Sequence, residues 1–245
     1  MPRVRLDKLL VDQGLAESRQ RAAALIRAGV VLVDNVPRDK PGTQISTDAV
    51  LRLKANPIPY VSRGGLKLEA ALDEFSVDPS GRTCADLGAS TGGFTDCLLQ
   101  RGATRVFAVD VGYGQLAWSL RTDDRVVVME RTNARHLESL PEPVSLIVGD
   151  LSFISLSKIL PAVQRLAHKG SEAVLLIKPQ FEVGKAHISK GGVVKDDVAR
   201  SAAITRVQQD AEALGARVLG VMDSPVPGAK KGNIEALIHL ELKPC

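Results

Sequence analysis

A glycine-rich segment between a predicted strand and a predicted helix is the clearest chemical feature of the sequence. Glycines in such a turn let the backbone approach a ligand closely, beside the amide groups at the start of the helix. A phosphate-binding Walker loop would need a lysine after the last glycine, and a dinucleotide fingerprint would need a further glycine at Ala89 or Ser90. The segment therefore predicts a cofactor loop of another kind. The residues expected to contact the cofactor are Asp86, Gly88, Ala89, Ser90, Gly92, Gly93 and Phe94.

Two carboxylates end other predicted strands. Asp110, followed by Val111, ends the second strand, where a carboxylate can accept both hydroxyls of a ribose. Asp150 ends the fourth strand and faces the same crevice, and Asn133 and Ala134 follow the third, where an adenine edge could be read. Each carboxylate alone could be a loop residue or a helix cap. Their joint placement at strand ends indicates a cofactor that contains adenosine.

The elements that must position these residues alternate along the chain after about residue 62. Apolar β-branched runs alternate with amphipathic helices, which predicts an α/β fold with a doubly wound, Rossmann-like sheet covered on both faces. The last two runs have no helix between them, so we expect an antiparallel pair at one edge. The predicted strands are 84–87, 106–110, 126–129, 146–150, 173–177, 218–222 and 234–242, and the helices start at 94 or span 116–120, 159–167 and 197–214.

The first 55 residues have a different pattern. Apolar residues at helical spacing predict two short helices broken at Gly14 and Gly29, followed by short strands joined by tight turns. Two prolines, Pro57 and Pro59, mark a stiff linker that we place at 56–62, with the α/β domain at 63–245. The first part carries a basic face, which is either solvated surface or a site for a polyanion. Its residues include Arg3, Arg5, Lys8, Arg19, Arg21 and Arg27.

Composition excludes several classes of protein. The 245 residues are 44% hydrophobic and 24% charged, with a net charge of +4, as in an ordinary globular protein. The three cysteines form no C-x-x-C pair, so neither a disulfide framework nor a zinc site is expected. No run is long and apolar enough for a spanning helix, and no secretory signal is recognisable, so we expect a cytoplasmic protein. Aromatic residues are only 3%, which argues against extensive base stacking.

Motifs spread over nearly the whole chain resemble a known family. Residues 5–10, 18–22 and 26–34 resemble the small α+β RNA-binding module of the fourth small-subunit ribosomal protein. The D-L-G-x-x-x-G-G-F loop with its later carboxylates resembles the S-adenosylmethionine-dependent methyltransferases. Together with segments 61–68, 150–155, 177–182, 190–194 and 232–235, it is similar to the hemolysin A (TlyA) family of ribosomal RNA 2′-O-methyltransferases, and more distantly to FtsJ-type enzymes.

The resemblance implies a catalytic tetrad of Lys67, Asp150, Lys178 and Glu235, with S-adenosylmethionine as cofactor and a cytidine ribose of ribosomal RNA as substrate. Crowding by Lys67 and by the sulfonium would disfavour the ammonium of Lys178 and let it act as a base. The two carboxylates would favour the charged form, so a base and a positioning group both stay open. The resemblance also implies RNA contacts by the basic residues of the first module. Arg63 and Lys190 lie in predicted loops near the crevice, where they either continue an RNA track or are ordinary solubilising charge. The short segment before the first helix favours an enzyme specific for the large subunit.

Other functions have weaker support in the sequence. The family name also denotes a membrane-active hemolysin, but neither a spanning segment nor a strongly hydrophobic amphipathic helix is found. Arg5-Leu6-Asp7 resembles the catalytic triplet of pseudouridine synthases, but it lies inside the small module. Methylation of a base carbon would need a Pro-Cys nucleophile, which occurs only at Pro244-Cys245. An RNA-binding protein without catalysis remains a further alternative.

Overall fold

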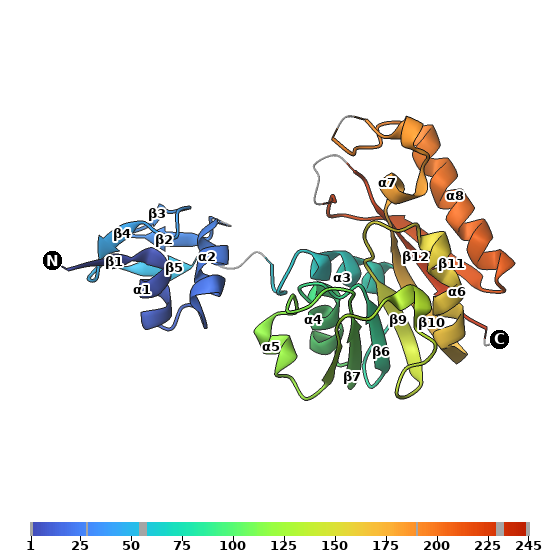
Figure 1. Ribbon diagram of the computed structural model, residues 1–245, viewed down its shortest axis with the longest axis horizontal. Helices are drawn as coiled ribbons and strands as arrows, with labels where there is room; N and C mark the ends of the chain where they lie inside the picture. Colours follow the sequence, from blue (N-terminus) through green and yellow to red (C-terminus); the bar gives the residue numbers. More distant parts are fainter. Residues whose placement is uncertain (1, 28, 54–57, 190, 229–232, 244–245) are drawn as a thin grey trace. The chain divides into compact units, whose positions relative to one another are not determined.

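The computed structural model describes residues 2–27, 29–53, 58–189, 191–228 and 233–243. The chain divides into two compact units, Met1–Pro59 and Tyr60–Cys245, and each is described by itself (Figure 1). This division falls within the segment that we predict as a linker.

The N-terminal unit combines two helices with short antiparallel strands. Helices α1 and α2 pack on each other, and their apolar faces form a core around Leu6, Leu10 and Ile26. Strands β1 and β4 form one antiparallel pair, and β3, β2 and β5 form a small antiparallel sheet. The elements are β1 Arg3–Arg5, α1 Leu6–Asp12, α2 Arg19–Arg27, β2 Val31–Val33, β3 Val36–Pro37, β4 Gln44–Ser46 and β5 Leu51–Leu53.

The larger unit is built on a seven-stranded sheet with the order β11-β12-β10-β9-β6-β7-β8. The strands from β6 to β10 run parallel to one another, whereas β12 is antiparallel to both β10 and β11. The strands are β6 Thr83–Leu87, β7 Arg105–Val109, β8 Val126–Met129, β9 Val144–Gly149, β10 Ala167–Ile177, β11 Arg217–Asp223 and β12 Ala236–Glu241. The helices are α3 Gly64–Glu74, α4 Gly93–Gln100, α5 Trp118–Arg121, α6 Leu160–Leu166, α7 Pro179–Glu182 and α8 Asp197–Ala213.

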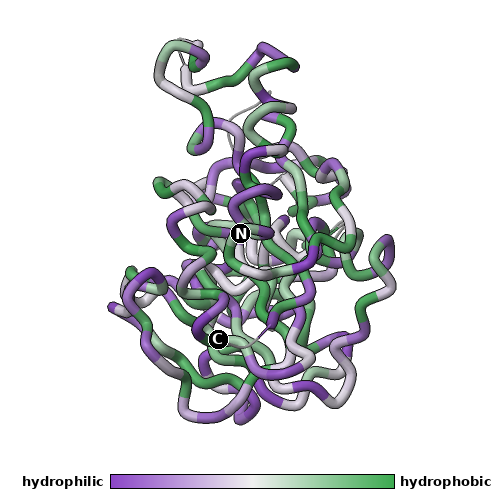
Figure 2. The backbone as a smooth tube through the Cα atoms, turned by 90° about the vertical axis from the view of Figure 1, so that its right-hand side faces the viewer, coloured by the Kyte–Doolittle hydropathy of each residue, from purple (hydrophilic) through white to green (hydrophobic). Residues whose placement is uncertain are grey.

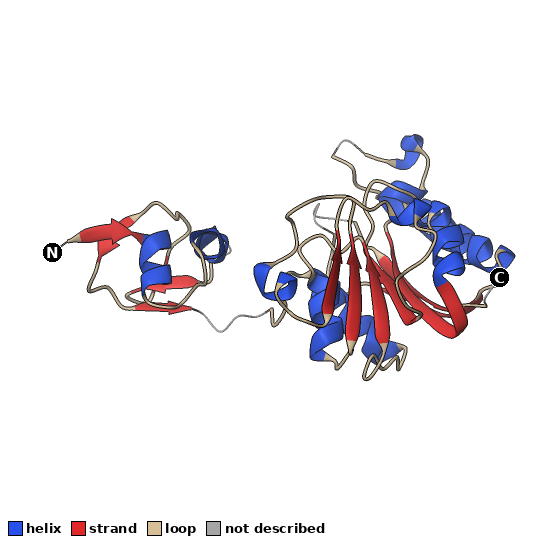
Figure 3. Ribbon diagram, turned by 60° about the horizontal axis from the view of Figure 1, so that its bottom comes forward, coloured by secondary structure: helices blue, strands red, loops and turns tan. Residues whose placement is uncertain are grey.

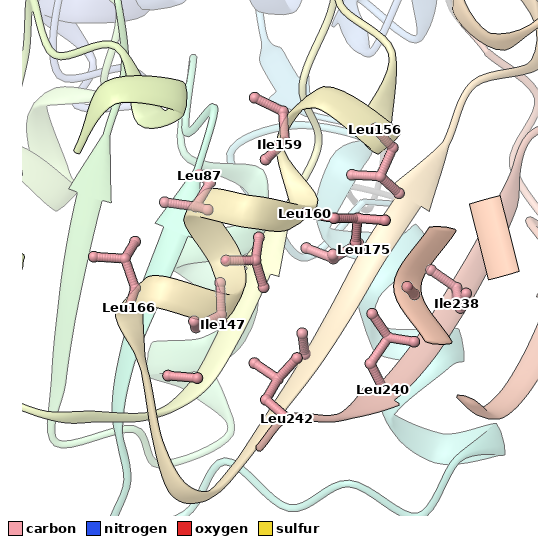
Figure 4. Packing of buried hydrophobic residues seen from close by; sticks show 14 of the residues in the cluster. Leu87, Ile147, Leu156, Ile159, Leu160, Leu166, Leu175, Ile238, Leu240 and Leu242 are labelled. Carbon is pink, nitrogen blue, oxygen red and sulfur yellow. The ribbon is translucent and has the colours of Figure 1, made fainter. Parts of the chain in front are cut away.

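Helices cover both faces of this sheet (Figure 3). Successive side chains of a strand point to opposite faces, so Ala85 and Leu87 belong to the apolar cluster that also contains residues of α6 and α8, while Asp86 points to α4. On the first face, Leu87, Ile147, Leu175 and Ile238 come from neighbouring strands and form one apolar cluster (Figure 4). The buried central strands thus have the apolar sequences that a doubly wound sheet requires. The predicted fold class and the antiparallel pair at the edge are confirmed.

Several predicted boundaries differ from the structure, and two of them concern strands beside the candidate site. Strand β10 begins at Ala167 rather than at residue 173, because Ala167 already pairs with Val144 before a register shift that ends at Glu172. Strand β12 begins at Ala236, so Glu235 precedes the strand instead of lying inside it. The segment before β12 is held by a loop: the Asn233 side chain accepts a hydrogen bond from the Val194 amide and donates one to the Gly192 carbonyl.

Hydrophilic and hydrophobic residues follow each other in short stretches along the backbone (Figure 2). Among the described residues, none of the helices has the length and hydrophobicity needed to cross a membrane.

Candidate active site

The sheet topology brings four predicted catalytic residues to one edge. Asp150 follows the carboxyl end of β9, and Lys178 follows the carboxyl end of the adjacent β10. Strand β12 is antiparallel to β10, with Ala236 opposite Ile177, so the residue before β12 arrives at the same edge. That residue is Glu235, and helix α3 supplies Lys67.

The four side chains form a continuous series of opposite charges. Lys67 Nζ lies 2.5 Å from Glu235 Oε2 and 3.9 Å from Asp150 Oδ2. Lys178 is ion-paired with Asp150 through Oδ1 and donates a hydrogen bond of 2.7 Å to Ser152 Oγ. Asp150 is therefore placed between the two ammonium groups.

Burial makes this arrangement specific. Lys67, Lys178 and Glu235 are buried, and Asp150 is three-quarters shielded. Ions removed from water need opposite charges and hydrogen bonds, or the cost of desolvation destabilises the fold. The two lysines and two carboxylates balance in formal charge, so each buried cation lies beside an anion.

A cavity of about 480 Å³ opens beside the tetrad, and all four residues line it. The glycine-rich loop forms another part of its wall through Gly88, Ala89, Ser90, Gly93 and Phe94. The arrangement places the four ionisable groups next to a space large enough for the reacting parts of two small ligands.

The glycines of the loop allow this close approach. Gly88 has φ +87°, and a Cβ there would lie 3.1 Å from the carbonyl oxygen of Asp150. Gly92 has φ +96° at the N-cap of α4, and its Cβ would lie 2.2 Å from the Leu120 side chain. Larger residues would therefore displace the loop from the catalytic edge or from α5.

A second cavity of about 420 Å³ shares Gly88, Ser90 and Asp150 with the first. Its other lining residues include four that we predict to bind the cofactor: Asp110, Val111, Asn133 and Ala134. The carboxylate of Asp110 accepts hydrogen bonds from the amides of Ser90 at 2.8 Å and Gly112 at 2.7 Å, which fixes its orientation. Each oxygen has a further lone pair that can accept from a ligand hydroxyl.

Two residues that we predict to contact the cofactor lie outside the lining of both cavities. Gly92 is the N-cap described above. Asp86 is fully buried, and its Oδ2 accepts hydrogen bonds from the Thr95 amide at 3.0 Å and the Thr95 hydroxyl at 2.7 Å. Burial raises the pKa of Asp86 to about 7. In the structure Asp86 fastens the first turn of α4 to β6.

Phe153 has no predicted role, but it is prominent in the structure. Its side chain is 90% exposed at the mouth of both cavities, and its φ of +65° is unusual for an aromatic residue. The ring lies 5.5 Å from that of Phe181 in a tilted arrangement. Phe153 and Phe181 lie in segments 150–155 and 177–182, which carry the family resemblance, but the exposure and the positive φ of Phe153 cannot be read from the sequence.

Glu182 was missed in the same way. It is buried and accepts hydrogen bonds from the Leu156 amide at 2.6 Å and the Ser155 hydroxyl at 2.7 Å. Burial raises the pKa of Glu182 despite these two hydrogen bonds. Glu182 therefore attaches the loop after Asp150 to the helix after Lys178.

The residues predicted to bind RNA lie in both units. Arg63 is exposed at the start of α3. Lys190 lies outside the described residues. The N-terminal unit carries the others, all of them exposed or half-buried, namely Arg3, Arg5, Lys8, Arg19, Arg21 and Arg27.

Comparison with known proteins defines the class. Residues 60–242 match the model of the FtsJ-like methyltransferases, and residues 4–51 match the S4 domain. The chain is thus an S-adenosylmethionine-dependent methyltransferase of the FtsJ-like class that carries an S4 domain. It belongs to the TlyA family. It is 51% identical over 241 residues to the 16S/23S rRNA (cytidine-2′-O)-methyltransferase TlyA of Mycobacterium tuberculosis, and the match covers 97% of this chain and 90% of the relative.

Two further relatives carry the hemolysin name. Hemolysin A of Brachyspira hyodysenteriae is 41% identical, covering 96% of this chain and 99% of the relative. A solved structure described as a hemolysin from Streptococcus thermophilus is 44% identical with a TM-score of 0.77, covering 99% of this chain and 90% of that one. The expectations of the family, the fold and the methyl donor are confirmed.

Proposed function

We propose that this protein transfers the methyl group of S-adenosylmethionine to a cytidine 2′-hydroxyl of ribosomal RNA. The observation that carries the proposal is the series Glu235, Lys67, Asp150, Lys178 at the wall of the first cavity. The TlyA relative of M. tuberculosis is named for this reaction.

The two adjoining cavities fit a donor and an acceptor. The second cavity offers a fixed carboxylate, Asp110, for ribose hydroxyls, and Asn133 and Ala134 for an adenine. The glycine-rich loop lies where the two cavities meet, and a Cβ at Gly88 would narrow that junction. We assign the adenosine part of the cofactor to the second cavity and its methionine part to the loop residues that line the first.

The tetrad supplies what a ribose hydroxyl needs in order to react. Bound S-adenosylmethionine supplies an electrophilic methyl group, whereas a 2′-hydroxyl is a weak nucleophile at neutral pH. We assign Lys178 to the hydroxyl, where a lysine can take its proton or stabilise the negative charge that develops on its oxygen. Asp150 holds the Lys178 ammonium in place, and Lys67, fixed by Glu235, holds Asp150 from the other side. The series limits the motion of the reacting groups.

The exposed Phe153 provides a surface for the target nucleotide. A base brought into the first cavity leaves its stack, and an aromatic ring at the mouth can replace the lost stacking. Phe181 supports the ring of Phe153 from the side. Outside the cavity, Arg63 and the basic residues of the S4 domain contact RNA phosphates, and the protein acts in the cytoplasm, where it meets ribosomal subunits.

Mapping of 2′-O-methyl groups tests the proposal. Ribosomal RNA from cells that lack this gene is incubated as naked RNA, as small subunits and as large subunits with the purified protein and S-adenosylmethionine. We expect a new 2′-O-methylcytidine in at least one of these substrates, and none with Lys178→Ala. Methylation of a base, or methyl transfer that Lys178→Ala leaves intact, would refute the assignment.

A further inference from the structure

In the N-terminal unit, the buried carboxylate of Asp7 binds two arginines from different elements. Its Oδ1 accepts a hydrogen bond from Arg5 Nε at 3.0 Å, and its Oδ2 accepts from Arg5 Nη2 at 2.8 Å. Arg19 Nη2 also donates to Oδ2, at 3.2 Å. The side chain of Asp7 is 6% exposed, against 47% for Arg5 and 60% for Arg19. One buried group therefore holds two guanidinium groups that still face solvent.

The backbone around this cluster is fixed. The amides of Leu6 and Asp7 donate to the carbonyls of Thr43 and Pro41, at 2.9 and 3.1 Å, so the start of α1 is attached to the turn before β4. The guanidinium of Arg5 lies over the same turn, where a Cβ on Gly42 would come within 3.4 Å of it. The other arginine is the first residue of α2. The positions of both cations thus depend on the fold and not on the local sequence alone.

A carboxylate in this position has an electrostatic cost for a surface that binds a polyanion. The hydrogen bond from Arg5 lowers the pKa of Asp7 to about 2, so the group is ionised at neutral pH. The cluster then carries two positive charges and one negative charge. A surface that attracts phosphates by net charge alone would be better without the carboxylate.

A geometric role accounts for the carboxylate. Arginine recognises phosphate oxygens through a planar fork of donors, and fixing such a long side chain on binding costs conformational entropy. A guanidinium that is already fixed by a buried partner has lost much of that freedom before RNA arrives, and its other donors remain available. Two fixed guanidiniums on neighbouring helix starts would suit adjacent phosphates of an RNA backbone.

We propose that Asp7 is a positioning residue for RNA binding, which holds Arg5 and Arg19 as a preformed pair for phosphodiester groups of ribosomal RNA. The inference rests on the proposed function, because it takes RNA as the ligand of the S4 domain. It adds a role for the acidic residue of the Arg5-Leu6-Asp7 triplet, which the catalytic proposal leaves unused.

Neutralising Asp7 separates the two roles of the carboxylate. Loss of a positioning group should weaken RNA binding, whereas loss of a negative charge should strengthen it. The full chain with Asp7→Asn is compared with Asp12→Asn, which removes an exposed carboxylate from the same helix. Binding to an unmethylated 23S ribosomal RNA transcript is measured over a range of salt concentrations. We expect Asp12→Asn to bind RNA as tightly as the wild type or tighter. We expect Asp7→Asn to bind at least about fivefold more weakly, because RNA binding must then fix the two arginine side chains that Asp7 holds in the wild type. Binding by Asp7→Asn that equals that of Asp12→Asn would overturn the proposal.

A cycle of variants shows whether Asp7 acts through the arginines. In the background Arg5→Gln with Arg19→Gln, we expect Asp7→Asn to have no further effect on RNA affinity. We also expect Asp7→Asn to raise KM for RNA and to leave kcat unchanged, because the catalytic series lies in the other unit. An equal loss of affinity in both backgrounds, or a loss confined to kcat, would contradict a positioning role. If the wild-type protein methylates no RNA, the proposed function fails instead.

A measurement on the wild-type protein covers the case in which Asp7→Asn does not fold. The Nε–H group of Arg5 donates to Asp7 and gives an NMR signal that can be followed directly. We expect this signal to be sharp in the free protein and to shift when a short synthetic RNA hairpin is added, while the hydrogen bond persists. A signal that does not respond to the hairpin, or that is exchange-broadened in the free protein, would also overturn the proposal.

Discussion

Each unit of the molecule contains a carboxylate placed between two cations, but the two clusters differ in the cation and in exposure. At the catalytic edge Asp150 lies between Lys67 and Lys178, which are buried. In the S4 domain Asp7 lies between Arg5 and Arg19, which face solvent. Lysine can exchange a proton, whereas arginine stays charged and binds phosphates through its fork of donors. The same local arrangement thus suits chemistry in one unit and backbone recognition in the other.

The comparison also shows how charge is balanced. Glu235 adds a second carboxylate to the largely buried cluster, so that its formal charges sum to zero. The S4 cluster has no such balance and keeps one excess positive charge toward solvent, where a polyanion can supply the counter-charge.

The largest expected effect comes from replacing the catalytic lysine by arginine, the cation of the S4 cluster. Lys178→Arg keeps the charge beside Asp150, but arginine cannot take a proton and does not fit the space of a lysine. We expect kcat for RNA methylation to fall by about 100-fold or more, in the range found for loss of general acid or base groups. Arg19→Lys in the S4 domain is the matched control and should leave kcat unchanged. Binding of S-adenosylmethionine, measured by calorimetry, should be retained in both variants.

A Lys178→Arg enzyme with near-normal kcat would show that only the positive charge of Lys178 is needed. It would then stabilise the developing charge on the 2′-oxygen and would not accept its proton.

A smaller effect concerns the stability of the buried cluster. Glu235→Gln leaves Lys67 without its 2.5 Å partner, and breaking a buried ion pair on one side destabilises a protein by about 3 kcal/mol. Glu241, at the end of β12, forms an exposed ion pair with Arg217. Glu241→Gln should lower the free energy of unfolding by less than about 1 kcal/mol. Urea unfolding of both variants measures the difference. Equal free energies of unfolding would mean that Glu235 does not compensate the charge of Lys67.

The two units are also expected to differ in the sign of their pH dependence. The pKa of Asp7 is lowered to about 2, so its contribution to stability is present above the unfolded pKa near 4 and is lost as the pH falls toward 2. The pKa of Asp86 is raised to about 7 by burial, so the larger unit is favoured by protonation of Asp86 and loses stability as the pH rises through 7.

Unfolding of each unit, followed by amide hydrogen exchange between pH 3 and pH 8, measures these two trends. Asp86→Asn, which imitates the neutral acid, should flatten the decrease of the larger unit's stability between about pH 5 and pH 8. Asp7→Asn should flatten the acid-side change of the S4 domain. A larger unit whose stability is unaffected by Asp86→Asn over this range would contradict the neutral state of Asp86.

The sequence located the glycine-rich loop and the strand ends, because glycines and carboxylates after apolar runs have direct physical meaning; their assignment to a cofactor stays a prediction. Asp110 and Asp150 were found in this way. Lys67 and Glu235 came from the family resemblance, since they are 168 residues apart and no local pattern connects them. Their meeting depends on the antiparallel β12, which brings its amino end to the catalytic edge.

Other features depend on tertiary contacts that the spacing of residues in the sequence does not predict. Asp86 looked like a cofactor ligand because it ends a strand, but its side chain points to the α4 face and bonds to Thr95. In the sequence Asp7 stood out only as part of the Arg5-Leu6-Asp7 triplet, and its contacts with Arg5 and Arg19 appear only when α1 and α2 are packed together. Phe153 adopts its positive φ in the loop that Glu182 holds through Ser155.

The distance along the chain between Lys67 and Glu235 also has a consequence for synthesis. Strands β6 to β10 can pair in order as the chain leaves the ribosome, but Lys67 has no Glu235 to pair with until β12 is about to emerge. A buried ammonium with an incomplete set of partners is unfavourable, and contacts between distant segments form late. The catalytic edge therefore becomes complete only after Glu235 and β12 have been synthesised, 168 residues after Lys67.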